Sequence, residues 1–92
     1  DKQGYRAAAA WLKENTAAED LIAVTDSRIT FYAERTGLIY DAKPPARAKY
    51  VAAIVKNENE RPDFVKAANQ EFSVWVDKHD KNMKILIYKK MP

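Results

Sequence analysis

The chain has no cysteine, only two glycines and a single histidine in 92 residues. The absence of cysteine excludes a disulfide scaffold, thiol catalysis and cysteine-based zinc sites. Two glycines are too few for a phosphate-binding loop, because such loops need glycine where the backbone approaches the phosphate. No apolar run exceeds six residues, whereas a membrane-spanning helix needs ~20, so the sequence contains no candidate span.

Apolar and aromatic residues are plentiful, at 47% and 11% of the chain. This content is too high for an intrinsically disordered protein and predicts one folded domain over residues 1–92. A chain of this size buries roughly 60–65% of its unfolded surface, enough for a modest core. Its 16 Lys+Arg and 13 Asp+Glu give a net charge of +3, too small by itself to indicate a nucleic-acid partner. The chain starts at Asp1 without an initiator Met or a signal-peptide pattern, so Asp1–Gly4 could be a tag remnant or mark a cut within a larger protein.

The spacing of apolar residues predicts helices alternating with strands. A helix is expected over Tyr5–Glu14, where apolar residues recur every three or four positions. The continuous apolar run Leu21–Thr25 is typical of a strand buried on both faces. Asp26 or Ser27 is a good N-cap for a second helix with a buried stripe of Ile29, Tyr32 and Ala33, and Gly37 is expected to stop that helix.

The second half of the chain predicts more strands and one more helix. Tyr50–Val55 fits either a buried strand or the middle of a helix from Pro45, and its β-branched residues favour the strand. Pro62 then begins a third helix to about Gln70. The remaining predicted elements are a strand at Leu38–Tyr40 and a hairpin of Phe72–Val76 and Met83–Tyr88 around the loop Lys78–Asn82. The expected fold is an α/β domain with a mixed, partly parallel sheet, about three flanking helices and a terminal β-hairpin.

Two aspartates follow predicted strands and are candidate site residues. Asp26 and Asp41 could line one crevice, because ligands of open α/β sheets bind beyond the carboxyl ends of strands. The simpler interpretation, which we favour, is that Asp26 caps a helix and Asp41 starts a turn. Arg35 could form a polar-aromatic cluster with Tyr32 and Tyr40, although its interaction with a helix dipole explains it more simply.

The predicted hairpin is basic. Its lysines are Lys78, Lys81, Lys84, Lys89 and Lys90, with Trp75 and Tyr88 nearby, and such a mixture suits single-stranded nucleic acid or an anionic membrane surface. The second strand ends in Lys89-Lys90, and lysines near a sheet edge discourage edge-to-edge pairing. A solvated sheet edge is the simpler interpretation. His79 lies in the loop without a recognisable catalytic partner, and we expect no catalytic residue, metal ligand or cofactor site in this chain.

One longer pattern resembles a known family. The run Ala8–Thr16 (Ala-Ala-Ala-Trp-Leu-Lys-Glu-Asn-Thr), the strand Leu21–Thr25 and the segment Phe31–Arg35 (Phe-Tyr-Ala-Glu-Arg) resemble the soluble tail of dolichyl-phosphate-mannose–protein mannosyltransferase-like membrane enzymes of bacteria and archaea. Those tails have an Ala/Trp-Leu-x-x-Asn helix, a strand and a Tyr-x-Gly-Arg helix end. This chain departs from the pattern at Glu34, where the family often has glycine. Two later strands also fit: Lys49–Val55 and Ile85–Lys89.

The resemblance implies a parent glycosyltransferase that transfers a sugar from a polyprenyl-phosphate carrier. Its catalytic acidic residues would lie in the multi-span membrane part, and none in this chain. The chain would be a non-catalytic accessory domain at the cell membrane, on the extracytoplasmic side. Its partners would be the membrane part of the same polypeptide and a lipid-linked sugar or acceptor. The alternative is an independent binding module that contacts nucleic acid, the less expected partner, or another acidic partner through the basic hairpin. A stand-alone enzyme at Asp26 and Asp41 ranks last.

Overall fold

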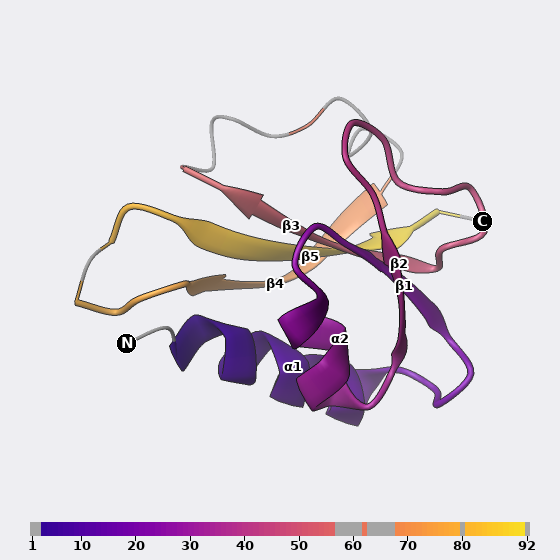
Figure 1. Ribbon diagram of the computed structural model, residues 1–92, viewed down its shortest axis with the longest axis horizontal. Coiled ribbons are helices and arrows are strands. Elements are labelled where there is room, and N and C mark those ends of the chain that lie inside the picture. Colours follow the sequence, from indigo (N-terminus) through magenta and orange to yellow (C-terminus); the bar gives the residue numbers. More distant parts are fainter. Residues whose placement is uncertain (1–2, 57–61, 63–67, 80, 92) are drawn as a thin grey trace.

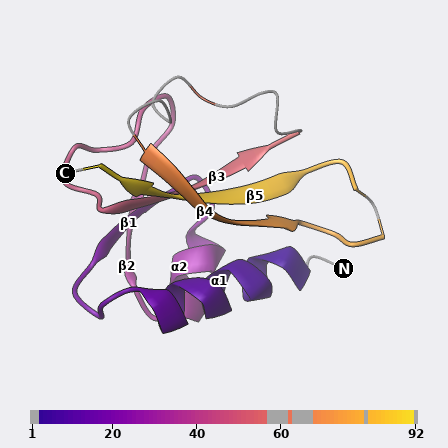
Figure 2. The same cartoon turned by 180° about the vertical axis from the view of Figure 1, so that it is seen from behind.

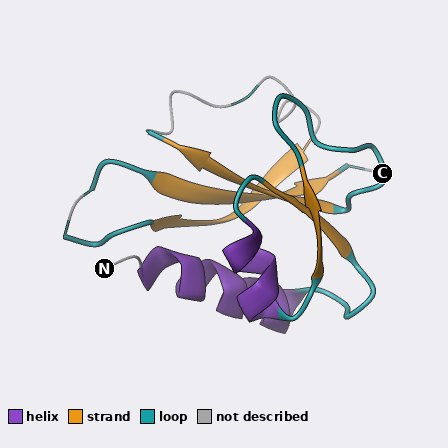
Figure 3. Cartoon of the chain, viewed as in Figure 1, coloured by secondary structure: helices purple, strands orange, loops and turns teal. Residues whose placement is uncertain are grey.

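The computed structural model describes residues 3–56, 62, 68–79 and 81–91. These residues form a mixed α/β fold with a five-stranded sheet and two helices (Figures 1 and 3). The elements are α1 (Gln3–Asn15), β1 (Leu21–Val24), α2 (Ser27–Ala33), β2 (Thr36–Ile39), β3 (Tyr50–Val55), β4 (Ala68–Trp75) and β5 (Lys84–Lys90).

The sheet has a parallel half and an antiparallel half. Its strand order is β2-β1-β3-β5-β4. Strand β1 runs parallel to both β2 and β3, whereas β5 runs antiparallel to β3 and β4. This confirms the partly parallel sheet and the terminal hairpin. Strands β1, β2 and β3 therefore end along the same edge of the sheet as the hairpin turn, where edge means the line formed by the strand ends. Strand β5 ends along the opposite edge.

Both helices cover the same face of the sheet (Figure 2). The predicted spacing of α1 is confirmed, since Tyr5, Ala8, Ala9 and Leu12 are buried. They pack with sheet residues such as Ile85, which is fully buried. Burying a Leu or Ile side chain contributes about 1.5–3 kcal/mol, so this apolar layer holds the helices on the sheet.

The opposite face of the central strands is also buried. Val51, Leu86 and Tyr88 are at most 1% exposed and belong to two smaller apolar clusters. Strands apolar on both faces give continuous hydrophobic runs rather than an alternating pattern. This is why β1 and β3 could be recognised as buried strands, and it confirms the strand interpretation of Tyr50–Val55.

The ends of the helices are fixed by backbone contacts. Asp26 is the N-cap of α2, as predicted, and its carboxylate accepts the N–H of Arg28 at 3.0 Å. Glu34 is the C-cap, in the left-handed conformation with φ 57°. The N–H of Gly4 donates to the carbonyl oxygen of Val76 at 2.9 Å. A side chain at Gly4 would collide with the backbone of β4, so glycine permits this close approach.

Three expectations need correction. The described residues contain two helices, not about three; of the third, predicted over residues 62–70, positions 63–67 lie outside the described residues and 68–70 begin β4. Gly37 does not stop α2, because Glu34 ends that helix and Gly37 belongs to β2. There it leaves room for the Thr30 side chain. Tyr32 is 40% exposed, and Thr30 takes its place in the buried stripe.

Candidate functional site

Arg35 joins the two helices. Its Nε donates to the Thr16 hydroxyl at 2.9 Å, and its Nη2 donates to the carbonyl oxygens of Thr16 and Lys13 at 2.9 and 3.1 Å. Its Nη1 donates to the carbonyl oxygens of Ala33 and Glu34 at 3.4 and 3.2 Å. These five bonds equal the number of guanidinium N–H donors. Arg35 thus caps the carboxyl ends of both helices, in agreement with the simpler interpretation, and its donors are committed to the fold.

Asp26 lies in a charged cluster at the start of α2. Arg28 contacts its carboxylate through Nε at 3.0 Å and Nη2 at 2.6 Å, and Tyr5 also hydrogen-bonds to it. The hydrogen bonds from Arg28 lower the pKa of Asp26 to about 2, and the same pairing raises the pKa of Arg28. The Arg28 guanidinium lies 4.3 Å from the Tyr5 ring centre, while burial raises the Tyr5 pKa. A carboxylate held this way is ionised at neutral pH and suits a structural role.

Asp41 lies at the same edge of the sheet as Asp26. It follows Tyr40, whose N–H donates to the carbonyl oxygen of Val24 at the end of β1 (3.1 Å). The topology therefore brings the two aspartates to one edge, as the sequence suggests, but Asp26 is paired with Arg28 and Asp41 is exposed. Arg35 lies away from both, because it precedes β2 rather than following it. Burial raises the pKa of Tyr40 to about 12, with a further contribution from Tyr88.

The lysines of the basic hairpin have different surroundings. Lys84 begins β5, and its Nζ lies 4.7 Å from the centre of the Trp75 ring. This cation–π contact occupies one face of an aromatic ring that would otherwise be available for stacking. Lys78 and Lys81 are exposed in the turn, as is His79, whose N–H donates to the carboxylate of Asp77 at 2.8 Å.

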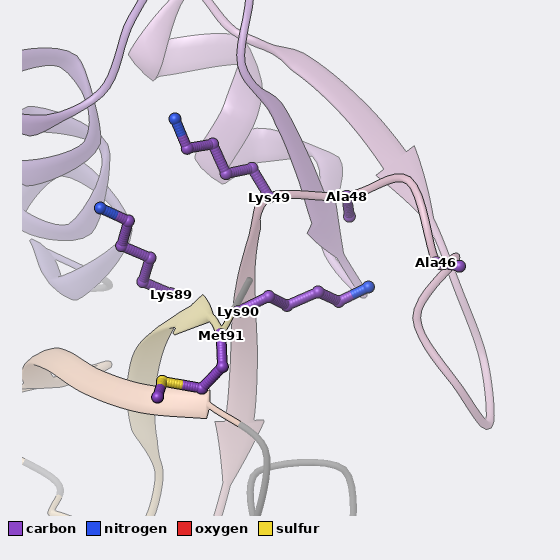
Figure 4. Close-up of a pocket in the computed structure, with 6 residues that line it drawn as sticks. All are labelled: Ala46, Ala48, Lys49, Lys89, Lys90 and Met91. Atoms are coloured by element: carbon purple, nitrogen blue, oxygen red, sulfur yellow. The ribbon is translucent and has the colours of Figure 1, made fainter.

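A cavity lies at the opposite edge of the sheet from this turn (Figure 4). It has a volume of about 320 Å³ and lies where the end of β5 meets the segment that precedes β3. Three lysines and three small or flexible apolar residues line it. We call it the basic pocket, and its residues are Ala46, Ala48, Lys49, Lys89, Lys90 and Met91.

The lysines of the basic pocket are partly engaged. Lys90 Nζ donates to the carbonyl oxygen of Pro45 at 2.6 Å, and Lys49 Nζ lies 3.6 Å from the Asp20 carboxylate. Figure 4 shows the side chains of Lys49 and Lys89 extending to one side and the side chain of Lys90 extending to the other. With three lysine side chains in its lining, the pocket carries a formal positive charge.

Sequence reasoning did not find this pocket. It placed Lys89 and Lys90 in the basic hairpin and near a sheet edge, but not beside a cavity. Their partner Lys49 is remote in sequence and joins them only through strand pairing, in which the Lys90 N–H donates to the Lys49 carbonyl oxygen at 2.9 Å. The one sequence signal is a Lys-Lys pair directly after an apolar strand, which does not identify the partner.

Comparison with known protein families, with curated proteins and with solved structures gives no match to this chain. Within the described residues, no group of histidine and acidic side chains is arranged to hold a metal ion. Over the same part of the chain, no helix is both long and apolar enough to cross a membrane.

Proposed function

We propose that the chain is a non-catalytic, extracytoplasmic accessory domain of a multi-span membrane glycosyltransferase that uses a polyprenyl-phosphate sugar. The observation that carries the proposal is the backbone of Glu34, with φ 57° and ψ 44°. Glycine enters this left-handed region without steric cost, whereas other L-residues are disfavoured there. The family pattern has glycine at this position, immediately before the arginine. The helix end of this chain therefore has the backbone geometry that the family's glycine suits.

The other residues of the resemblance also have specific structural roles. Trp11 stacks on Phe72 with ring centres 5.8 Å apart and meets Tyr50 edge to face at 6.3 Å, so it packs α1 against the sheet. Asn15 Nδ2 donates to the carbonyl oxygen of Trp11 at 2.9 Å at the end of α1. Arg35 then ties this end of α1 to α2. The shared pattern therefore coincides with a packing and capping system, which supports a scaffold rather than a catalytic centre.

The role that follows is to support the membrane part of the same polypeptide, next to a lipid-linked sugar or its acceptor. The first test is the reading frame that encodes the chain. Several apolar stretches of ~20 residues upstream would support the proposal. A start codon directly before Asp1, with no such stretch in the frame, would contradict it.

The sidedness of the domain can be measured in the whole protein. The chain has no cysteine, so a K81C variant places one thiol in the exposed turn. We expect a membrane-impermeant maleimide to modify the peptide carrying this thiol in intact cells, as read by mass spectrometry. Permeabilised cells provide the control for full labelling. Labelling only after permeabilisation would place the domain on the cytoplasmic side and refute that part of the proposal.

The non-catalytic role has its own assay. The 92-residue chain should not turn over a polyprenyl-phosphate sugar, whereas the whole protein should. Turnover by the chain alone, abolished by D26N combined with D41N, would instead favour an enzyme at the carboxyl edge of the sheet.

A further inference from the structure

We propose that the basic pocket binds a phosphate monoester whose organic group is apolar. Its volume of about 320 Å³ is at the lower end of the range for small-molecule sites, about 300–1,000 Å³. The proposal goes beyond the accessory function and is independent of it, because it concerns only residues of this chain.

The cationic side of the pocket fits a doubly charged anion. Lys49 lies in the segment just before β3, Lys89 lies in the neighbouring strand β5, and both side chains extend to the same side (Figure 4). A phosphate monoester carries close to two negative charges at neutral pH, since its second pKa is about 6. Two ammonium groups neutralise that charge, and each offers three N–H donors. A carboxylate, with one charge, would leave one lysine uncompensated.

One acidic side chain competes for this site. The carboxylate of Asp20 lies 3.6 Å from Lys49 Nζ, whereas charge-assisted N–H···O bonds are about 2.7–2.9 Å long. The pair is therefore a loose ion pair that a phosphate can displace. Asp20 is otherwise held by its own turn, where its carboxylate accepts the N–H of Ala17 at 2.9 Å. The amino group of Lys89 has no partner among the residues that the structure describes.

The remainder of the pocket selects an apolar substituent. Ala46, Ala48 and Met91 line it, together with the aliphatic stems of the lysines. Met91 is 53% exposed, so an alkyl chain that covers it removes apolar surface from water. Among the residues that the structure describes, the lining contains neither an aromatic ring nor a side-chain amide, the groups that stack on or pair with a nucleotide base. A short alkyl phosphate therefore fits better than a nucleotide.

The two methionines of the chain provide a probe and an internal control. Met91 lines the basic pocket, whereas Met83 lies by the hairpin turn at the opposite edge of the sheet. With both methyl groups labelled with ¹³C, titration of hexyl phosphate should shift the Met91 resonance saturably and leave Met83 unchanged. Inorganic phosphate should bind at least tenfold more weakly, because it lacks the alkyl chain that covers the apolar lining.

Matched pairs of variants compare the basic pocket with the hairpin turn at the opposite edge of the sheet. K49Q combined with K89Q should weaken hexyl phosphate binding at least tenfold, since two charge-assisted hydrogen bonds are lost. K78Q combined with K81Q makes the same charge change at the hairpin turn and should leave the affinity unchanged. D20N removes the competing carboxylate, keeps the turn acceptor and should tighten binding several-fold.

Each of the following results would overturn the proposal. An unresponsive Met91, or equal shifts of Met83 and Met91, would mean that no ligand enters the pocket. Equal affinity for inorganic and hexyl phosphate would refute the apolar subsite and leave a free-phosphate site. If vesicles of phosphatidylglycerol shift Met91 while monomeric hexyl phosphate does not, the lysines contact a membrane surface. Phosphatidylcholine vesicles are the control for that arm.

Discussion

Replacing Arg35 should destabilise the protein more than any other exposed or half-exposed charge change in the helical layer. The R35Q variant removes hydrogen bonds to Lys13, Thr16, Ala33 and Glu34 at once. A hydrogen bond to a charged group contributes about 1.5–3 kcal/mol when well shielded. Arg35 is only half-buried and water can replace some of these bonds, so we expect a total loss of about 2–3 kcal/mol.

The assay is equilibrium unfolding in urea, followed by circular dichroism. With a slope of about 1 kcal/mol per molar, the transition midpoint of R35Q should fall by about 2–3 M. R35K keeps the charge at the helix ends, which contributes about 0.3–1 kcal/mol, but it lacks the planar fork. We therefore expect R35K to lie between R35Q and the wild type.

The matched control is R47Q, which removes the same charge from an exposed loop position. It should change the free energy of unfolding by no more than about 0.5 kcal/mol. If R35Q also lies within 0.5 kcal/mol of the wild type, Arg35 does not join the helices as described. If R35K matches the wild type, charge alone explains the effect and the five-bond geometry is irrelevant.

Three further predictions concern the same layer. E34G should be more stable than E34A by about 0.5–1 kcal/mol, because both remove the ion pair to Lys13 and only glycine adopts φ 57° without strain; equal stability in urea would contradict this. G37A should lose about 1–3 kcal/mol from its clash with the Thr30 side chain. The T30A/G37A double variant should recover part of that loss, and strictly additive losses would show that the two sites do not touch. Finally, the pairing that lowers the Asp26 pKa to about 2 stabilises the folded state above about pH 4, and this contribution is lost as the pH falls through about 2. The stability difference between the wild type and D26N, which keeps the cap, should therefore shrink from pH 5 to pH 2; a constant difference would rule out the ion pair as its source.

Much of the fold could be predicted because its periodicities are local. The spacing in α1 and the continuous apolar run of β3 each arise within one element. Residue Gly37 was misassigned because a glycine near a helix end usually adopts the left-handed conformation, and here Glu34 adopts it instead. A single sequence does not show that Gly37 of β2 lies against the Thr30 side chain of α2, where only glycine leaves enough room.

The candidate site was less predictable than the fold. The carboxyl edge with Asp26 and Asp41 follows from strand order, and the sequence suggested it. The basic pocket depends on the register of β3 with β5, in which Tyr50 pairs with Lys89. That register is not evident from a single sequence, because both strands are apolar on both faces and no alternation of polar and apolar residues marks which positions pair.

The contact between Gly4 and Val76 has a consequence for biosynthesis. It joins α1, the first element of this chain, to the end of β4, as Figure 1 shows. The β1–α2–β2 unit can form early, because its contacts are close in sequence. The apolar stripe of α1 must wait for the hairpin strands before its burial is complete. Folding of this chain is thus completed only after β4 and β5 have been synthesised, and chaperones that recognise exposed apolar helices have their main opportunity in that interval.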